Sequence, residues 1–342
     1  MKAIILVGGE GTRLRPLTYL TTKSMVPVLN KPFIEYAIRY LHNHKVDEVI
    51  LAMGHKPDSI KDYFSNASRP NIKLTYSIEQ KPLGTAGAVK NAEQNIDGTF
   101  FVINGDIFTD INLTDMLDFH RKKNAKVTIA LTPVEDPTQF GVVETDGQQR
   151  VTRFVEKPSL QQVTSHMINA GVYILEGETL RHIPPDRYFM FERDVFPRLV
   201  DDRESVFGYT SDSYWIDMGT TKKYLQLNHD LLYGKSLQAA YQAEAIHVHE
   251  QSSVHAQSKL TGPILIDRGC TISRGAQLLG PVVIGSDCHI HDNAIIDGSV
   301  LWQKISVGKH ATLRNCIVAS GSYIEDNARI ENSTISQHTT SE

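Results

Sequence analysis

The sequence predicts two folds in one chain, an α/β domain with a mostly parallel sheet and, after it, a parallel β-helix. Up to about residue 233, short apolar strands alternate with amphipathic helices, which is typical of a sheet covered by helices on both faces. Beyond residue 260, apolar residues recur at every sixth position, with Gly, Asp and Asn between them, and this period indicates a β-helix. We therefore expect domains at 1–233 and 261–342, joined by a polar linker at 234–260.

The elements of the first domain follow from the spacing of their apolar residues. Residues 3–7 are too few and too β-branched for a helix and predict a buried strand, whereas residues 32–44 show helical spacing. Asp146-Gly147 is expected to turn a hairpin. By the same criteria, further strands are predicted at 46–52, 74–78, 99–103, 127–131, 141–144, 151–156 and 169–174, and helices from 83, at 114–123 and at 222–232.

Two apolar stripes run through the repeat and are expected to stack inside the coil. Cys270 and Cys288 belong to the second stripe, so both are predicted to fill the core rather than to bind metal. The phase breaks near Trp302 and then resumes. Coil edges and apolar side chains such as Trp302 are expected to support self-association, which predicts a homo-oligomer. The first stripe consists of Ile266, Ile272, Leu278, Ile284, Ile290 and Ile296.

Composition excludes several classes of protein. The 342 residues are 41% hydrophobic and 22% charged, as in ordinary globular proteins. A formal net charge of −4 gives no general attraction to nucleic acid, so no nucleic-acid partner is expected. Three cysteines without metal-ligand spacing argue against a disulfide framework or a zinc site. Because no apolar stretch approaches the roughly 20 residues of a membrane span and no signal peptide is recognisable, we expect a cytoplasmic protein without a membrane partner.

The clearest candidate site follows the first strand. The run Gly8-Gly9-Glu10-Gly11-Thr12-Arg13 has three glycines in four positions, which suggests a loop whose backbone approaches a ligand closely. Converging backbone N–H groups form an anion site, and Arg13 and Lys23 add full positive charges. A second predicted strand end carries Asn104-Gly105-Asp106, and parallel sheets bind ligands at such ends. We therefore predict that the loop binds a polyphosphate, although its spacing is that of neither a dinucleotide fingerprint nor a P-loop.

The same loop resembles the signature of the sugar-phosphate nucleotidyltransferases. The likeness begins with residues 8–18 and Lys23 and continues, in the same order and spacing, through five further runs. Residues 84–87 and 191–197 are most similar to the mannose-1-phosphate guanylyltransferases of this family. The resemblance covers essentially the whole chain, and it implies a Rossmann-like catalytic domain with a left-handed β-helix of hexapeptide repeats. The five runs are Pro82–Gly87, Asn104–Asp106, Phe154–Pro158, Ile168–Gly171 and Trp215–Thr220.

The resemblance implies transfer of a nucleotidyl group from a nucleoside triphosphate to a sugar 1-phosphate, with release of pyrophosphate. Because the attacking phosphate oxygen is ionised near neutral pH, positioning and electrostatic stabilisation should dominate over base catalysis. Arg13 would hold the triphosphate and stabilise its departing end with help from Lys23, and Lys157 would hold the sugar phosphate. Asp106 and Asp217 would share a Mg²⁺ ion, which prefers carboxylate and phosphate oxygens.

Two sets of binding residues carry over with the resemblance, together with one departure from the family pattern. The family usually has Pro-Lys-Pro around the second cation, whereas this chain has Thr22-Lys23-Ser24, so a less rigid placement of Lys23 is expected. The nucleotide would contact Gly8, Gly9, Gly11, Thr12, Glu79, Gln80, Gly84, Thr85 and Ala86. The sugar phosphate would contact Gly141, Glu156, Lys157, Asn169 and Gly171.

The base and the sugar are not fixed by these residues. A carboxylate such as Glu79 suits the two donors of guanine, whereas a Gln amide suits uracil or thymine, and Glu79 is followed by Gln80. The resemblance favours GTP with mannose 1-phosphate. The alternatives are a glucose-1-phosphate uridylyl- or thymidylyltransferase and a non-catalytic regulatory homologue that binds nucleotide-sugar. The complete set of cations and carboxylates argues against the non-catalytic homologue.

Overall fold

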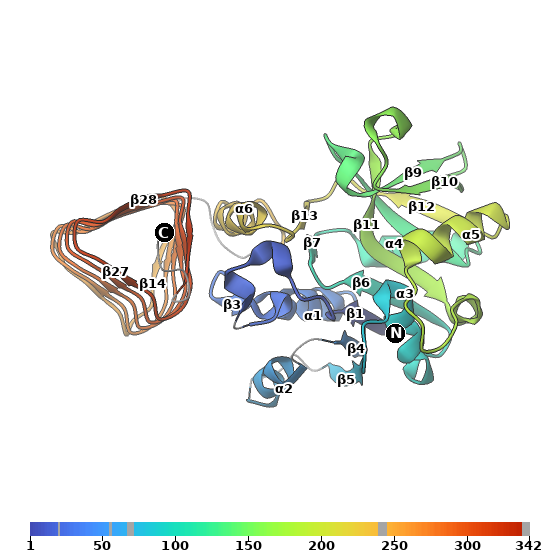
Figure 1. Ribbon diagram of the computed structural model, residues 1–342, viewed down its shortest axis with the longest axis horizontal. Coiled ribbons are helices and arrows are strands. Elements are labelled where there is room, and N and C mark those ends of the chain that lie inside the picture. Colours follow the sequence, from blue (N-terminus) through green and yellow to red (C-terminus); the bar gives the residue numbers. More distant parts are fainter. Residues whose placement is uncertain (20, 55–56, 67–71, 239–244, 337–342) are drawn as a thin grey trace. The chain divides into compact units, whose positions relative to one another are not determined.

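The computed structural model describes residues 1–19, 21–54, 57–66, 72–238 and 245–336. The chain divides into two compact units (Figure 1). The first unit contains Met1–Glu10 and Ile34–Trp215, and the second contains Gly11–Phe33 and Ile216–Glu342. Residues 11–33 and 216–233, which the sequence assigns to the α/β domain, thus belong to the same unit as the β-helix.

A nine-stranded mixed sheet forms the core of the first unit, with the order β10-β9-β11-β6-β1-β4-β5; β8 pairs with β11, and β12 pairs with β8. Strands β6, β1, β4 and β5 are parallel, whereas β11 runs antiparallel to β6 and β8. The strands are β1 (Lys2–Leu6), β4 (Glu48–Met53), β5 (Lys73–Ile78), β6 (Thr99–Asn104), β8 (Val127–Pro133), β9 (Gly141–Thr145), β10 (Val151–Glu156), β11 (Met167–Glu176) and β12 (Val206–Thr210). Two short strands lie outside this sheet, β7 (Ile107–Thr109) and β13 (Trp215–Asp217).

The helices bury one face each against this sheet. In α4, Leu113, Met116 and His120 are buried, and the side chain of Asn112 caps the helix by accepting from two backbone N–H groups. The strand and helix predictions are confirmed, but α2, α5 and β12 were not predicted. The helices of this unit are α1 (Phe33–Asn43), α2 (Pro57–Asn66), α3 (Gly84–Asn91), α4 (Leu113–Lys122) and α5 (Phe196–Asp201), which follows a π-helical turn at Phe191–Val195.

The adjacent strands β1 and β6 set the position of the predicted site in this unit. Leu6 is in register with Asn104, so both strands end at the same edge of the sheet. Gly105 donates its N–H to Leu6 O at 2.9 Å. A Cβ at Gly105 would lie 2.4 Å from that same oxygen, so only glycine fits here. The glycine loop and Asp106 therefore leave neighbouring strand ends, as the sequence predicts.

Three sheets of short parallel strands form the left-handed β-helix of the second unit, and its triangular coils are visible in Figure 1. The first sheet contains β14 (Ile246–Val248), β17 (Ile264–Ile266), β20 (Val282–Ile284), β23 (Val300–Leu301), β26 (Ile317–Val318) and β29 (Thr334–Ile335). The second contains β15 (Ser253–Val254), β18 (Thr271–Ile272), β21 (His289–Ile290), β24 (Ser306–Val307) and β27 (Tyr323–Ile324). The third contains β16 (Lys259–Thr261), β19 (Gln277–Leu279), β22 (Ile295–Asp297), β25 (Thr312–Arg314) and β28 (Arg329–Glu331).

The coil length changes once within this stack. Leu279 pairs with Asp297, but the next pairs are Val283 with Val300 and Ile284 with Leu301. The corner between Asp297 and Val300 is therefore one residue shorter than the equivalent corner of the preceding coil, between Leu279 and Val283. The later coils keep the shorter length. This break explains the change of phase seen in the sequence near Trp302.

The first coil begins earlier than the sequence suggests. Strands β14, β15 and β16 lie within 234–260, where a linker is predicted, and each pairs in parallel with the next strand of its sheet. Their apolar side chains are sparse and partly exposed, so the six-residue pattern is weak there. Residues 239–244 of the predicted linker and 337–342 of the predicted β-helix lie outside the described residues.

The core of the β-helix confirms one prediction and corrects another. Cys270 and Cys288 are buried, as predicted, and both thiols point to backbone carbonyls of the neighbouring coil. Trp302 is only 8% exposed, and its Nε1–H donates to Tyr224 Oη at 2.9 Å. It is therefore not the exposed apolar side chain expected to support self-association, and the homo-oligomer stays a prediction.

The remaining elements of the second unit are α6 (Thr221–Leu232) and the loop of residues 11–33. Thr220 caps α6 by accepting the N–H of Lys223 at 3.3 Å. The loop contains the short hairpin β2 (Pro27–Val28) and β3 (Lys31–Pro32). Three 3₁₀ turns precede it, at Thr12–Leu14, Leu17–Tyr19 and Lys23–Met25.

Candidate active site

The two predicted cations lie in the loop of the second unit. Gly11 is in the left-handed region (φ 65°), and a Cβ there would lie 3.0 Å from Lys23 Cβ and 3.1 Å from Thr18 Cγ2. Thr18 Oγ1 also donates to Gly11 O at 2.8 Å. The glycine thus lets Lys23 pack directly against the turn that carries Arg13, whose side chain is exposed, as is that of Thr12. The structure places the two cations in one folded loop.

Asp217 and the Arg13 guanidinium both lie beside Gly219. A Cβ at Gly219 would lie 2.6 Å from Asp217 Oδ2 and 3.3 Å from Arg13 Nη2, so this glycine leaves room for both charged groups. Asp217 is 9% exposed, and its Oδ1 forms an ion pair with Lys223 Nζ from the first turn of α6. Positive and negative charges therefore alternate across this site.

Lys223 is a further charged residue of this site and lies outside the predicted set. A cation is unfavourable in the first turn of a helix, because the N-terminal end of the helix dipole is positive. Such a placement therefore signals a nearby anion, and in this structure the anion is Asp217. The adjacent Lys222, by contrast, is exposed.

The first unit places Glu79 against the glycine loop. A Cβ at Gly8 would lie 3.0 Å from Glu79 Oε1, and Glu79 Oε2 accepts the N–H of Leu83 at 2.8 Å. Burial raises the pKa of Glu79, while the hydrogen bond from Leu83 opposes that shift. Gln80 and Gly9 are exposed. Glu79 therefore lies beside Gly8 and is held by the Leu83 N–H, whereas Gln80 is on the surface.

The small residues at the start of α3 have a packing role. Ala86 and Gly87 both donate their N–H groups to Phe189 O at 3.0 Å, so the segment before α5 crosses this helix at backbone distance. A Cβ at Gly84 would lie 2.6 Å from the same oxygen. This close approach accounts for Gly84, Ala86 and Gly87 without a ligand, and the predicted contact with the nucleotide base stays a prediction.

Three of the predicted residues gather at β11 and the end of β6. Asn169 Oδ1 accepts the N–H of Gly171 at 2.9 Å, and Gly171 has a φ of 72°. A Cβ at Gly171 would lie 2.8 Å from Asn104 Nδ2. Among the described residues, Asn104 Oδ1 is a buried acceptor without a hydrogen-bond partner. Asn169 and Gly171 thus adjoin the Asn104–Asp106 turn, and Asp106 itself is half-buried.

Glu192 connects the α3 residues to the β11 residues and was not predicted as a site residue. Thr85 Oγ1 donates to Glu192 Oε2 at 2.8 Å, and Tyr173 Oη donates to Glu192 Oε1 at 3.4 Å while accepting from Asn169 Nδ2 at 2.8 Å. Burial raises the pKa of Glu192, and the charge of Asp106 adds to this effect. The segment 191–197 was noted in the sequence, but a buried carboxylate is not visible from local pattern.

Glu156 ends strand β10, Lys157 follows it, and Gly141 begins β9 opposite Glu156. A Cβ at Gly141 would lie 2.7 Å from Phe154 Cζ and 3.0 Å from Glu156 Oε2. Burial, followed by the nearby charge of Glu192, raises the pKa of Glu156. Lys157 has a φ of 48° and its ammonium lies 3.9 Å from Glu156 Oε1. The lysine side chain is 57% exposed and can therefore reach a substrate.

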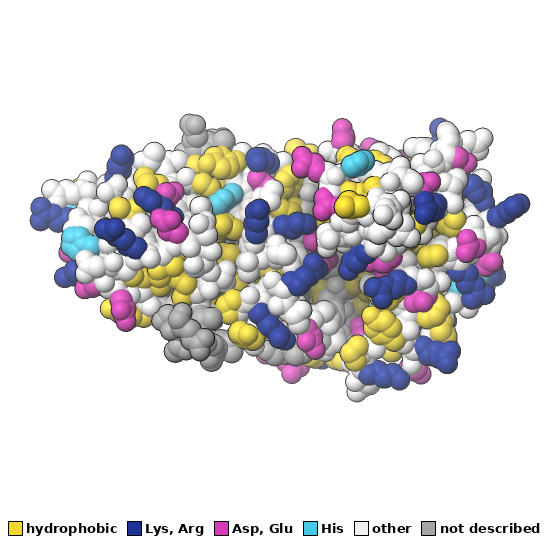
Figure 2. Space-filling view, turned by 45° about the horizontal axis from the view of Figure 1, so that its top comes forward, with side chains coloured by type: hydrophobic (Ala, Val, Ile, Leu, Met, Phe, Trp, Pro, Cys, Tyr) yellow, Lys and Arg dark blue, Asp and Glu magenta, His cyan; other side chains and the backbone are white. Residues whose placement is uncertain are grey.

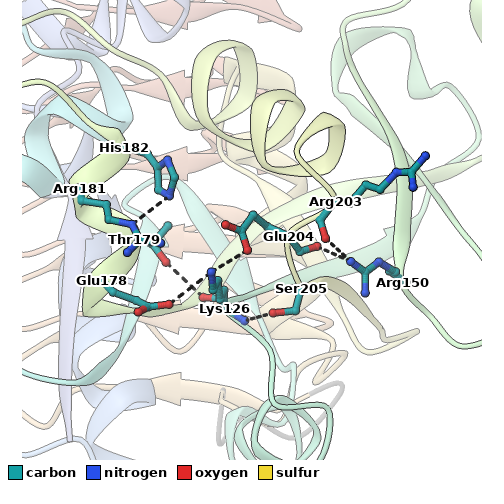
Figure 3. Close-up of polar contacts among 9 residues, drawn as sticks. All are labelled: Lys126, Arg150, Glu178, Thr179, Arg181, His182, Arg203, Glu204 and Ser205. Atoms are coloured by element: carbon teal, nitrogen blue, oxygen red, sulfur yellow. Dashed lines mark hydrogen bonds and ion pairs between the residues drawn. The ribbon is translucent and has the colours of Figure 1, made fainter.

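A second polar cluster lies at the edge of the sheet where β8 and β12 begin (Figure 3). Lys126 Nζ contacts Glu204 Oε2 at 2.6 Å and Glu178 Oε1 at 3.6 Å, and Arg150 donates to the carbonyls of Arg203 and Glu204. A cavity of about 780 Å³ adjoins this cluster, and none of the predicted site residues lines it. Because parallel sheets bind ligands at the opposite strand ends, we assign the cluster to stability.

Three general features of the described residues bear on metal binding, membrane insertion and surface charge. The described residues contain no group of three or more His, Cys, Asp or Glu side chains arranged around a metal site. None of the helices in the described ranges is long and apolar enough to cross a bilayer. Figure 2 shows basic and acidic side chains interspersed over one face of the molecule.

The protein has an α/β fold with a glycine loop, two cations in a folded loop and carboxylates at strand ends. These features define the class of proteins that handle phosphorylated substrates. Residues 2–234 match the family described as nucleotidyl transferase, and the chain belongs to this family. Residues 243–340 match the LbH domain of the EIF2B epsilon subunit, in agreement with the left-handed β-helix.

Named relatives cover most of the chain. It is 36% identical to the mannose-1-phosphate guanylyltransferase of Mycobacterium tuberculosis over 81% of this chain and 77% of that one. It is 34% identical to the mannose-1-phosphate guanyltransferase of Schizosaccharomyces pombe, over 98% and 90%. It is also 30% identical to the UTP–glucose-1-phosphate uridylyltransferase of Synechocystis, over 95% and 90%. The chain is accordingly a nucleotidyltransferase that acts on sugar 1-phosphates.

A solved structure is similar to this protein over about two thirds of its length. HddC from Yersinia pseudotuberculosis has a TM-score of 0.59 and 31% identity, and the match covers 66% of this chain and 97% of HddC. HddC complexed with GMP-PN matches with a TM-score of 0.58.

Proposed function

We propose that this protein transfers the guanylyl group of GTP to mannose 1-phosphate, yielding GDP-mannose and pyrophosphate. Relatives named mannose-1-phosphate guanylyltransferase support this pair of substrates. The GMP-PN complex of HddC supports a guanine nucleotide. UTP with glucose 1-phosphate is the second candidate, because one relative is a uridylyltransferase for that sugar phosphate.

The convergence of Arg13 and Asp217 on Gly219 is the observation that carries the proposal. An exposed guanidinium offers two parallel donors to phosphate oxygens, and a carboxylate beside it offers a hard oxygen ligand to a cation. A loop that only turned the chain would need neither group. Arg13 and Lys23 would hold the triphosphate and stabilise the leaving pyrophosphate, which is where negative charge builds up in the reaction.

The first unit would supply the other groups. Lys157 would hold the attacking phosphate of the sugar, and its exposed ammonium supports this role. Because that phosphate is ionised near neutral pH, no protein base is needed, and orientation of the two anions would provide most of the rate enhancement. Gly141, Glu156, Asn169 and Gly171 would bind the sugar, and the α3 and glycine-loop residues named above would bind the nucleotide.

Mg²⁺ would be held by Asp106 and Asp217. The donor set fits, because both ligands are carboxylates, and a hard cation in such sites takes its remaining ligands from phosphates and water. Asp217 Oδ1 is paired with the Lys223 ammonium, with which the ion would compete for this carboxylate. When bound, the ion would neutralise charge on the phosphates of both substrates.

The test of this proposal is pyrophosphate release across four nucleoside triphosphates and two sugar 1-phosphates. GTP with mannose 1-phosphate should give a kcat/KM at least about tenfold above the other pairs, which corresponds to about 1.4 kcal/mol of discrimination. If UTP or dTTP with glucose 1-phosphate were the best pair, the second candidate would replace the first. No turnover with any pair would remove the proposal.

The metal role has its own variant. Asp106→Ala is expected to abolish turnover, and a chelator should do the same to the wild-type protein reversibly, with recovery on addition of Mg²⁺. Asp118→Ala is the matched control, because Asp118 lies on α4 with a side chain that is 71% exposed. Near-normal turnover of Asp106→Ala would contradict the assigned role.

A further inference from the structure

The hairpin that follows Lys23 has an unfavourable backbone conformation. Its two turn residues, Leu29 and Asn30, have φ values of 44° and 64°. Asparagine tolerates the left-handed region, but leucine seldom adopts it, and two-residue hairpin turns normally place Asn or Gly at such positions. A conformation of this kind persists only where the surrounding structure fixes it. The contacts around this hairpin should therefore show what fixes it.

Both turn residues are held by parts of the second unit that lie far away in sequence. Asn228 Oδ1, on α6, accepts the N–H of Leu29 at 2.9 Å, and the Leu29 side chain is 2% exposed. Asn30 Nδ2 donates to Ile284 O in the β-helix at 3.0 Å. The turn is thus anchored on one side by a helix and on the other by a coil of the β-helix.

A chain of hydrogen bonds connects the β-helix to the first strand of the hairpin. Trp302 Nε1–H donates to Tyr224 Oη at 2.9 Å, and Tyr224 Oη–H donates to Pro27 O at 2.5 Å. Tyr224 is fully buried, and burial raises the pKa of its hydroxyl, so the hydroxyl keeps its proton and remains a donor. In a chain of this kind each bond polarises the next. Pro27 lacks a backbone N–H, so its carbonyl is its only backbone anchor.

The hairpin in turn holds the cation-bearing turn. Phe33 donates its N–H to Val26 O at 3.1 Å, and Val26 donates its N–H to Lys23 O at 3.3 Å. Thr22 and Ser24 are both buried and lie within hydrogen-bond distance of each other, at 3.3 Å. Residues 22–24 lack the fixed φ of proline, so their placement depends on these contacts.

We propose that Trp302 and Tyr224 are positioning residues for Lys23, and that the β-helix holds the triphosphate-binding loop in place through this chain of hydrogen bonds. This inference rests on the proposed function only in assigning the triphosphate to Lys23. It predicts that damage to the hydrogen-bond chain weakens the interaction with the nucleoside triphosphate, whereas the sugar 1-phosphate, assigned to Lys157, is unaffected.

The test uses the full-length protein with Tyr224→Phe and Trp302→Phe, alone and combined. Each single variant should raise the KM for the nucleoside triphosphate on the order of three- to tenfold, the effect of one net hydrogen bond, and leave the KM for the sugar 1-phosphate unchanged. The double variant should cost little more than Tyr224→Phe, because both changes break the same chain. Hydrogen exchange of peptides from residues 22–33 should become faster in all three variants.

Two control variants separate positioning from general damage. Tyr323→Phe removes a hydroxyl from an exposed tyrosine of the same β-helix, and Ile290→Val weakens its core away from the hairpin. Both controls should keep the wild-type KM values and the wild-type exchange of residues 22–33, even if Ile290→Val lowers the Tm. Equal effects in the controls, unchanged exchange, or unchanged KM for the triphosphate in Tyr224→Phe would overturn the proposal. Lack of transfer by the wild-type protein would instead refute the proposed function.

Discussion

Gly171 offers a sharp test of the site geometry, because a single methyl group there should have two separable effects. The residue has a φ of 72°, and an added Cβ would lie 2.8 Å from Asn104 Nδ2 and 3.0 Å from Ile107 Cγ1. Gly98 is the matched control, since its φ is 64° but nothing lies within 4 Å of an added Cβ. Comparison of Gly171→Ala with Gly98→Ala therefore isolates the steric effect.

The magnitudes follow from these two environments. A left-handed conformation costs an alanine about 1–2 kcal/mol relative to glycine, at both positions. Overpacking of the buried position adds about 1–3 kcal/mol at Gly171 alone. The gain from restricting the unfolded chain is common to both variants and cancels in the comparison. Gly171→Ala is thus expected to lose about 1–3 kcal/mol more free energy of unfolding than Gly98→Ala.

Urea unfolding provides the assay. The chain has two tryptophans, so in a Trp302→Phe background the fluorescence of Trp215 reports on the first unit alone. Trp215 Nε1–H donates to Ala170 O at 2.8 Å, next to the substituted residue. Gly171→Ala should also raise the KM for the sugar 1-phosphate, because Asn169 and Asn104 contact this residue. Equal unfolding free energies for the two variants would refute the geometry described here.

Three further perturbations have defined outcomes. Because burial raises the pKa of Glu192 above 4.5, the folded state holds that proton more tightly, and the unfolding free energy should fall as pH rises from about 4.5 through the raised pKa. Urea titrations of Glu192→Gln should show a shallower fall. Lys223→Met removes the ammonium paired with Asp217 and should lower the half-saturating Mg²⁺ concentration on the order of fivefold, as expected for a partly exposed ion pair. Lys126→Ala should lower the Tm slightly and leave kcat and KM unchanged, because its partners lie away from the proposed site.

Much of the fold was accessible from the sequence, because its signals are local. The strands of the sheet and the coils of the β-helix repeat their apolar residues at fixed spacing, and this period survives in the structure. Helix α2 was not predicted, since among its described side chains only Ile60 and Phe64 are buried. Strand β12 carries Gly208 in its middle, where a Cβ would meet Leu131 Cδ1 at 2.5 Å, and a glycine weakens a strand signal.

The candidate site was only partly accessible for a different reason. Arg13 and Asp217 were predicted from motifs that resemble a family, but their convergence on Gly219 depends on how distant segments pack. Lys223 and Glu192 gain their importance from single tertiary contacts, and no spacing in the chain marks such contacts. A sequence can thus indicate which groups a site contains, whereas the partners that hold them depend on the fold.

The shortened corner between Asp297 and Val300 has a consequence for assembly of the β-helix. A stack of identical coils can slip by one coil, because every strand finds an equivalent partner in the shifted arrangement. Here the buried Ser299 bridges the corner, donating to Asp297 O at 2.7 Å and accepting the N–H of Cys316 at 2.9 Å. A shifted stack would place a long corner against a short one and break these bonds. The irregular coil therefore specifies the order in which the coils stack and disfavours exchange of coils between molecules.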